Sequence, residues 1–258
     1  MLWKVLMMRF DVLTLFPDMF RAVLGDSIIG RARKAGLLEL NFIDIRDFTK
    51  NKHRKVDDTP YSGGGGMLMS PEPVYAAYMS IAKGLSYKPY TIFMSPQGEV
   101  FNQDKAVELT KHKHVVLLCG HYEGIDQRVL DEIVDAEISL GDFVLTGGEI
   151  PAMAVIDAAA RLIPGVLAND GSFQNESHFQ GLLEHPQYTK PRVWHDKEVP
   201  EVLISGNHKL IEQWKHEQSL LATLKKRPDM LREAWLTEED VSFLERHGEV
   251  PDEVEIQP

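Results

Sequence analysis

Short apolar segments alternate with amphipathic ones through the first two thirds of the chain. Apolar runs bounded by turn residues predict β-strands at 10–16, 38–43, 91–94, 115–119 and 135–138. Between them, apolar residues recur at helical spacing in segments 19–24, 74–82, 105–110 and 125–133. Because strands that alternate with helices build layered domains, this order predicts an α/β domain with a parallel sheet.

The pattern changes beyond residue 150. An apolar, alanine-rich helix is predicted at 151–163, and Pro164 and Gly165 end it. Residues 168–179 are rich in Asn, Asp, Gly, Ser and Gln, which is typical of a flexible linker or of an ordering loop. Helix-forming segments follow at 209–224, 230–234 and 238–246. We therefore predict a first domain at 1–167, a flexible linker at 168–180, and a small, mostly helical domain at 181–258.

The charge balance argues against nonspecific binding to nucleic acids. The net charge is −11, whereas such binding depends on Lys and Arg that neutralise phosphates. Basic residues nevertheless cluster within 31–34, 50–55 and 209–227, either as a local RNA-binding face or as ordinary solvated surface. The single cysteine, Cys119, excludes a disulfide within the chain and fits a reducing compartment, so we expect a cytoplasmic protein. No apolar run is long enough to predict a transmembrane helix.

Three unusual loops follow predicted strands. Their sequences are SPQG at 95–98, GHYEG at 120–124 and LGDFVLTGGE at 140–149. Ligands of parallel sheets bind beyond the carboxyl ends of the strands, and backbone groups exposed at such turns suit a flat heterocycle. A tight turn would explain any one loop, but three together, carrying Glu123 and Asp142, predict a shared small-molecule pocket. Glu123 can accept a hydrogen bond from a ligand ammonium or be an ordinary exposed carboxylate.

Other features leave alternatives open. The glycine run at 63–66 fits a plain flexible loop or a binding loop, and the Gly-Lys-Ser/Thr of a phosphate loop does not follow it. Arg161, on the apolar helix, either meets an anion or polar base or faces solvent. Asp11 is interpreted as a surface or capping residue. The histidines lack metal-site spacing, so we expect no protein metal site.

Motifs along nearly the whole chain resemble the bacterial tRNA (guanine-N1)-methyltransferase family. In the first domain they are LFP at 15–17, RDFT at 46–49, HRKVDD at 53–58, the glycine run with MLM at 67–69, SPQG at 95–98, CGHYEGID at 119–126 and GDFVLTGGE at 141–149. Later motifs are GLLEHPQYTKP at 181–191 and LISGNH at 203–208. A series of this length in one order is far more specific than a single glycine motif.

The resemblance implies a SPOUT-type fold, in which a parallel sheet carries a deep trefoil knot, followed by a tRNA-binding helical domain. It also implies a homodimer whose active sites are each built from both chains. The implied cofactor is S-adenosyl-L-methionine, and the residues expected to bind it are Met94, Pro96, Gly120, Tyr122, Glu123, Leu140, Leu145, Gly147 and Gly148.

The resemblance further implies that N1 of guanosine 37, in the anticodon stem-loop of tRNA, receives the methyl group. Arg161 matches the family's catalytic arginine. Counting back from the GLL motif at 181–183 places the family's catalytic aspartate at Glu176, a glutamate in this chain, with Asp170 as an alternative base. Asp57 matches an acid that reads the guanosine next to the target, and the family links activity to Mg2+.

Two other functions remain open from the sequence. One is a SPOUT methyltransferase that acts on a different RNA nucleotide through the same pocket. The other is a tRNA-binding module without catalysis, an alternative that the glutamate at position 176 keeps open.

Overall fold

The computed structural model describes residues 7–63, 65–168, 176–179 and 181–248. The chain divides into two compact units, residues 1–170 and 171–258, which we describe separately. Asp170 lies outside the described residues. Among the residues that the structure describes, no helix is both long enough and apolar enough to cross a membrane.

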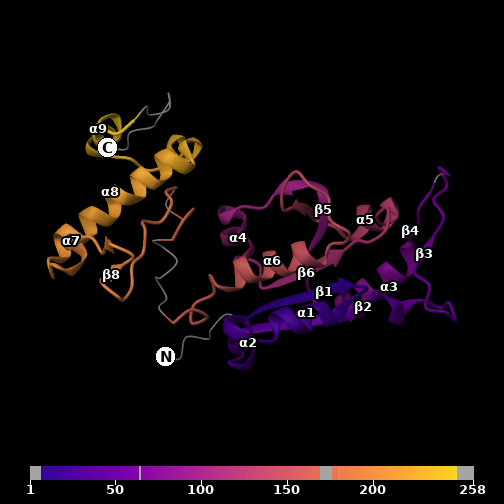
Figure 1. Cartoon of the computed structure of the whole chain (residues 1–258). Helices are drawn as coiled ribbons and strands as arrows, with labels where there is room; N and C mark the ends of the chain where they lie inside the picture. Colours follow the sequence, from indigo (N-terminus) through magenta and orange to yellow (C-terminus); the bar gives the residue numbers. More distant parts are fainter. Residues whose placement is uncertain (1–6, 64, 169–175, 180, 249–258) are drawn as a thin grey trace. The chain divides into compact units, whose positions relative to one another are not determined.

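A five-stranded parallel sheet forms the centre of the first unit (Figure 1). Its order is β2 (Leu38–Asp44), β1 (Met8–Thr14), β6 (His114–Cys119), β5 (Tyr90–Val100) and β7 (Ala136–Ser139). All neighbouring pairs of strands run parallel. The predicted α/β domain with a parallel sheet is therefore confirmed.

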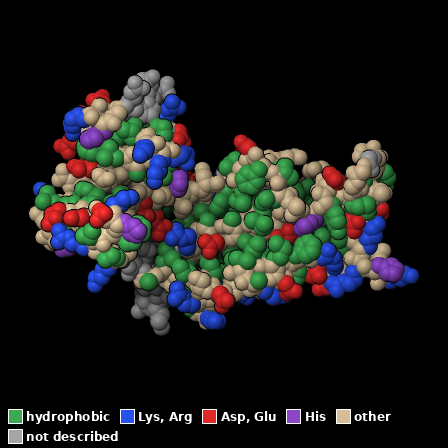
Figure 2. Space-filling model, viewed as in Figure 1, with side chains coloured by type: hydrophobic (Ala, Val, Ile, Leu, Met, Phe, Trp, Pro, Cys, Tyr) green, Lys and Arg blue, Asp and Glu red, His purple; other side chains and the backbone are tan. Residues whose placement is uncertain are grey.

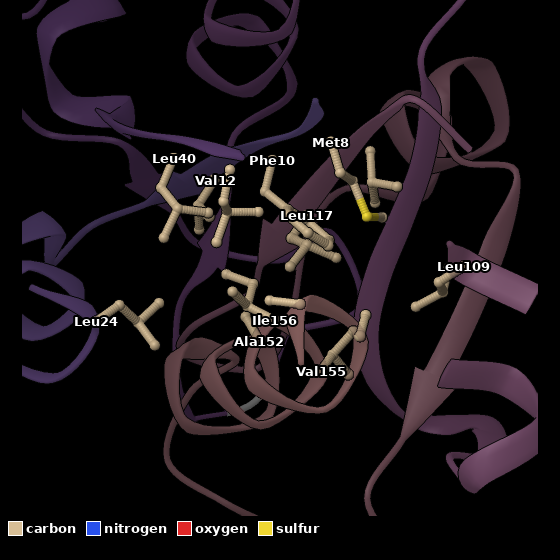
Figure 3. Close-up of a cluster of buried hydrophobic side chains, with 14 of the residues drawn as sticks. Met8, Phe10, Val12, Leu24, Leu40, Leu109, Leu117, Ala152, Val155 and Ile156 are labelled. Carbon is tan, nitrogen blue, oxygen red and sulfur yellow. The ribbon is translucent and has the colours of Figure 1, made fainter. Parts of the chain in front are cut away.

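Successive side chains of the central strand β6 enter two separate hydrophobic cores. Val115, Leu117 and Cys119 belong to one core, and Val116 and Leu118 belong to the other. Both faces of β6 are buried because side chains alternate across a strand and helices cover both sides of this sheet. Figure 3 shows the first core, where β1 and β6 residues such as Val12 and Leu117 meet α6 residues such as Ile156.

The helices divide between these two cores. The core in Figure 3 receives side chains from α1 (Pro17–Leu24), α2 (Ser27–Lys34), α4 (Gln103–Leu109) and α6 (Glu149–Ala160). The opposite core receives side chains from η1 (Ile45–Phe48), α3 (Pro71–Ala82) and α5 (Gln127–Ile133). Pro17 and Pro71 begin α1 and α3, a position where proline's fixed φ suits a helix and no backbone donor is lost.

Two helices differ from the sequence predictions. Helix α2 was not predicted, because its basic residues and the glycine at position 30 weaken the helical signal. A Cβ at Gly30 would lie 2.2 Å from the carbonyl oxygen of Gly25, so glycine allows a close approach there. The helix predicted at 151–163 ends at Ala160, and Arg161 is its C-cap residue. Pro164 disfavours helical geometry in the residue before it, which explains the earlier end.

Strand β5 is also longer than predicted. It was expected to end at Met94, but it continues to Val100, and its pairing with β7 shifts register between Met94 and Glu99. The SPQG segment at 95–98 bulges out of the ladder within this shift. After the bulge, β5 pairs with β7 again from Glu99. A Cβ at Gly98 would lie 2.4 Å from the carbonyl carbon of Glu137 in β7, so only glycine lets the two strands approach at this point.

A small antiparallel pair, β3 (Asp57–Asp58) and β4 (Leu68–Met69), flanks the glycine run. Met69 forms a parallel bridge with Ile125, and its N–H donates to the carbonyl of Gly124 at 2.9 Å. The loop that contains Asp57 is therefore attached to the loop that follows β6.

Asp11 is not a surface or capping residue, as was predicted, because its side chain is fully buried. Its carboxylate accepts hydrogen bonds from Arg9 at 2.8 Å and Asn41 at 2.7 Å and lies 2.8 Å from Nε2 of His114. Burial raises the pKa of Asp11, but the hydrogen bonds from His114, Arg9 and Asn41 outweigh burial and hold that pKa below its ordinary value. The alternating pattern of the strand does not reveal such a partner set.

The second unit is mostly helical. It contains α7 (Glu201–Ile204), α8 (His208–Lys226), the 3-10 helix η3 (Pro228–Arg232) and α9 (Glu238–Glu245). Its core is formed by Leu220, Leu231, Ala234, Leu236 and Leu244. The helix predicted at 230–234 is the 3-10 helix that begins at Pro228. A short hairpin of β8 (Val193–Trp194) and β9 (Lys197–Glu198) was not predicted.

Candidate functional site

A cavity of about 260 Å³ lies at the carboxyl ends of β6 and β7, beside the bulge of β5. It is lined by the three loops that the sequence singled out, those following Met94, Cys119 and Ser139. All of the residues expected to bind the cofactor line it: Met94, Pro96, Gly120, Tyr122, Glu123, Leu140, Leu145, Gly147 and Gly148. The fold thus brings Met94 and Gly148, which are more than 50 positions apart in the sequence, to the same pocket.

The second and third loops are in direct backbone contact. The N–H of Gly148 donates to the carbonyl of Gly120 at 3.0 Å, and His121 forms an antiparallel bridge with Gly147. A Cβ at Gly148 would lie 2.8 Å from the Cα of Cys119. Glycine is required at position 148 because any side chain would force these two loops apart.

Glu149 connects three segments beneath the pocket. Its side chain is almost fully buried, at 2% exposure. The hydroxyl of Thr14, at the end of β1, donates to its Oε1 at 2.7 Å, and Nε2 of His121 lies 2.9 Å from its Oε2. Glu149 is also the first residue of α6, where the helix dipole favours a negative charge. One carboxylate therefore holds the end of β1, the loop after β6 and the start of α6 together.

The ring of His121 is held on its other sides by aromatic side chains. Its centroid lies 4.9 Å from that of Phe16 and 6.1 Å from that of Tyr122. A Cβ at Gly147 would lie 2.2 Å from Nε2 of His121, so the absence of a side chain at 147 makes room for the His121–Glu149 pair. Tyr122 has a φ of +61°, a backbone conformation that is costly for a tyrosine and is concentrated at functional sites.

The pocket has apolar walls and an acidic mouth. Phe93, Met94, Ile138 and Leu140 supply apolar surface, while the Glu123 side chain is exposed at the opening. The glycine run reaches this point, because a Cβ at Gly66 would lie 2.5 Å from Oε1 of Glu123. Of the two interpretations of the glycine run, its position beside the pocket favours the binding loop over a remote flexible one.

Neither Arg161 nor Asp57 of the first unit lines the pocket. Arg161 caps the carboxyl end of α6, whereas the pocket lies at the amino end of the same helix. The residues of α6 rise 1.5 Å each, so Arg161 is about 18 Å along the helix from Glu149. Glu176 is a half-buried residue of the second unit. Asp57 is half-buried in β3.

Cysteine and metal chemistry find little support at this site. Burial raises the pKa of the Cys119 thiol well above its ordinary value, and the nearby charge of Glu149 raises it further. Cys119 is therefore a packing residue rather than a nucleophile. Among the described residues, no three His, Cys, Asp or Glu side chains come close enough together to hold a metal ion.

Sequence reasoning assigned no role to Thr14, His121 or Glu149. A signal existed for Glu149, which is an acid placed between a Gly-Gly pair and an apolar, alanine-rich helix. An acid at the first turn of such a helix is either exposed or specifically paired. The partners come from β1 and from the loop after β6, and only the tertiary structure identifies them.

The fold and the pocket define an α/β protein with a cavity, lined by loops, at the carboxyl edge of a parallel sheet. The sequence model of the family described as tRNA (Guanine-1)-methyltransferase TrmD matches residues 8–233. The chain belongs to this family, and the resemblance seen in its motifs is confirmed.

Individual relatives agree over most of their length. A protein of Ruminiclostridium cellulolyticum is 59% identical over 223 residues, covering 86% of this chain and 96% of the relative. A protein of Alkaliphilus oremlandii is 54% identical over 244 residues, covering 93% and 98%. One from Staphylococcus epidermidis is 52% identical over 240 residues, covering 93% and 97%. All three are named tRNA (guanine-N(1)-)-methyltransferase.

The Glu149 contacts predict a specific stability effect. Glu149→Ala leaves the Thr14 hydroxyl and the His121 ring without their buried partner, so the free energy of unfolding should fall by about 2–3 kcal/mol. Urea unfolding measures this fall. Glu123→Ala, which removes an exposed carboxylate of the same pocket, is the matched control and should change stability by less than about 0.5 kcal/mol. Equal losses in the two variants would contradict the proposed role of Glu149.

Proposed function

We propose that this protein transfers a methyl group from S-adenosyl-L-methionine to N1 of guanosine 37 in the anticodon loop of tRNA. The observation that carries the proposal is the pocket at the carboxyl edge of the sheet, into which all the expected cofactor-binding residues converge. Relatives that match more than nine tenths of this chain are named tRNA (guanine-N(1)-)-methyltransferase, which supports N1 of a tRNA guanine as the methyl acceptor.

The residues present fit the cofactor. Apolar walls from Phe93, Ile138 and Leu140 suit the adenine, and backbone groups of the three loops can bond to its edge. The exposed carboxylate of Glu123 is the natural partner of the cofactor's ammonium group. When bound, the cofactor supplies an electrophilic methyl group on a sulfonium.

The chemistry on the RNA needs a base and a charge acceptor. Guanine N1 carries a proton at neutral pH, and its removal leaves negative charge on N1 and O6. The carboxylate of Glu176 takes the N1 proton, and the Arg161 guanidinium stabilises the charge that develops on O6. With the cofactor bound, the N1 electron pair that Glu176 exposes would be available to take up the methyl group, with the sulfur as the leaving group.

A single chain does not place Arg161 at its own cofactor pocket. Arg161 lies about 15 Å along α6 from Pro151, the residue of this helix that lines the pocket, and is therefore too far away to touch a guanine held against the cofactor. Phe143, Val144 and Ile150 also leave apolar side chains exposed near the pocket, at 55%, 81% and 51%. We therefore propose a homodimer in which one chain supplies the cofactor pocket and its partner supplies Arg161. The close packing of the loops after β6 and β7 supports a trefoil knot of the SPOUT type.

The surface near the pocket suits RNA. Lys50, Lys52, His53, Arg54 and Lys55 are all exposed in the segment before β3. Figure 2 shows Lys, Arg and His side chains at the end of the first unit where Figure 1 labels β3 and β4. Asp57 follows them in β3, where its carboxylate can accept from the guanine N–H groups of the neighbouring nucleotide. Phosphate contacts to this segment offset the unfavourable net charge of the whole chain.

The proposed function also assigns roles to the second unit and to Mg2+. The helical second unit, with basic residues at both ends of α8, serves as a tRNA-binding domain at 181–258, joined to the catalytic domain at 1–167 by the linker at 168–180. Mg2+ is part of the proposal because the family links activity to this ion, and the phosphate oxygens of RNA are ligands of the kind that Mg2+ prefers. The single cysteine fits a cytoplasmic location.

The direct test uses purified protein, S-adenosyl-L-methionine and a tRNA with guanosine at positions 36 and 37. Methylation at N1 removes a pairing edge, so reverse transcription should stop at nucleotide 37 only after the reaction. The same tRNA with adenosine at 37 is the control and should show no stop. A stop at another nucleotide would instead indicate a different SPOUT methyltransferase, and cofactor binding without methylation would indicate a tRNA-binding module.

The role of Glu176 is tested by two variants. Glu176→Gln keeps the size of the side chain but removes the base, so turnover at saturating tRNA should fall about 100-fold or more. Glu176→Asp keeps a carboxylate and should retain turnover within about tenfold of the natural protein. Single-turnover methylation with labelled cofactor measures both rates. Full turnover by Glu176→Gln would exclude Glu176 as the required base.

A further inference from the structure

A second cavity, of about 510 Å³, lies at the opposite edge of the sheet, where β5 and β6 begin. Its walls include Tyr87, Lys88, Tyr90, Lys111, His112 and Lys113. Strand β6 runs from this cavity to the cofactor pocket, and at about 3.3 Å per residue the two are about 20 Å apart. The residues proposed for methyl transfer leave this cavity unused.

The cavity is basic, although the chain as a whole is acidic. Lys88 is paired with Asp135 at 2.6 Å. Lys111 and Lys113 are exposed, and among the described residues neither has an acidic partner within ion-pair distance. Lysines of this kind can bind phosphate without first breaking an internal ion pair.

A buried hydrogen-bonded chain fixes one wall of the cavity. His114 is 4% exposed and lies with Nε2 2.8 Å from Asp11 and with Nδ1 3.1 Å from the hydroxyl of Tyr87. The carboxylate of Asp11 is held in turn by Arg9 and Asn41. The half-exposed ring of Tyr87 is therefore anchored to the core through two buried side chains.

The other wall is a stacked aromatic pair. The rings of Tyr90 and His112 lie 4.0 Å apart with planes only 10° from parallel. Aromatic side chains interleaved with lysines are typical of surfaces that bind RNA, where bases or sugars stack on rings and phosphates meet the ammonium groups. A pocket for a purely inorganic anion would not need these rings.

We propose that this cavity is a second, remote contact for the RNA substrate. The ammonium groups of Lys111 and Lys113 bind backbone phosphates, and the rings of Tyr87, Tyr90 and His112 contact the adjoining sugar or an unpaired base. This inference rests on the proposed tRNA substrate. It assigns the cavity to affinity for the RNA rather than to methyl transfer, because it lies at the far edge of the sheet from the pocket.

The test uses Lys111→Ala, Lys113→Ala and the double variant, with Arg21→Ala of α1 as a control that removes one positive charge outside the three basic clusters and outside this cavity. The double variant should raise the Kd for full-length tRNA by about five- to tenfold at moderate salt, since two phosphate contacts are lost. The slope of log Kd against log salt concentration should fall by about 1.5–2. Turnover at saturating tRNA and the Kd for S-adenosyl-L-methionine should stay unchanged.

The outcomes separate this inference from the proposed function. An unchanged Kd and salt slope in the double variant, or an equal effect of Arg21→Ala, would overturn the remote contact while leaving methylation intact. Absence of methylation by the natural protein would overturn the proposed function instead. A loss of turnover at saturating tRNA in the double variant would also contradict a contact that serves affinity alone.

Discussion

The buried carboxylate of Glu149 is the constraint on which the site depends. It accepts a hydrogen bond from Thr14 at the end of β1 and faces His121 in the loop after β6, while its own backbone starts α6. A carboxylate in such a position is costly unless each lone pair finds a donor, so the three segments are fixed relative to one another. The glycines at 147 and 148 let the loops approach closely enough for these bonds to form. The shape of the pocket therefore depends on the two contacts of the Glu149 carboxylate and on glycine at positions 147 and 148.

The two proposed functional surfaces lie at opposite edges of the sheet. The carboxyl edge carries the pocket, the strained Tyr122 and the exposed basic segment before β3. The amino edge carries the Asp11–His114–Tyr87 chain beneath exposed lysines. Between them the central strand β6 is buried along its whole length and is apolar after His114. An acidic protein can in this way hold a polyanionic substrate, because the few basic residues that matter are concentrated where the RNA is expected to lie.

The sequence was most informative where one physical rule dominates. The apolar run at 115–119 and the helical spacing at 74–82 predicted layers that the structure contains as β6 and α3, and the three loops predicted the pocket. Helix α2 escaped prediction because Gly30 lowers its propensity and only the contact with Gly25 explains it. The end of α6 before Arg161 depends on Pro164, which acts through the preceding residue. Apart from Arg9, the partners of Asp11 and Glu149 lie 28 or more positions away in sequence, a distance at which no local pattern carries information.

The central claim is that the catalytic centre is assembled from two chains, with the pocket in one and Arg161 in its partner. Mixed dimers of two inactive variants test this claim most directly: Arg161→Ala, and Leu140→Trp, which fills the pocket. With equal mixing, half of the dimers carry both variants and each of these has one intact site, so methylation should return to about a quarter of the natural rate. If differently tagged chains co-purify as mixed dimers and methylation stays absent, each site is built within one chain and the account is wrong.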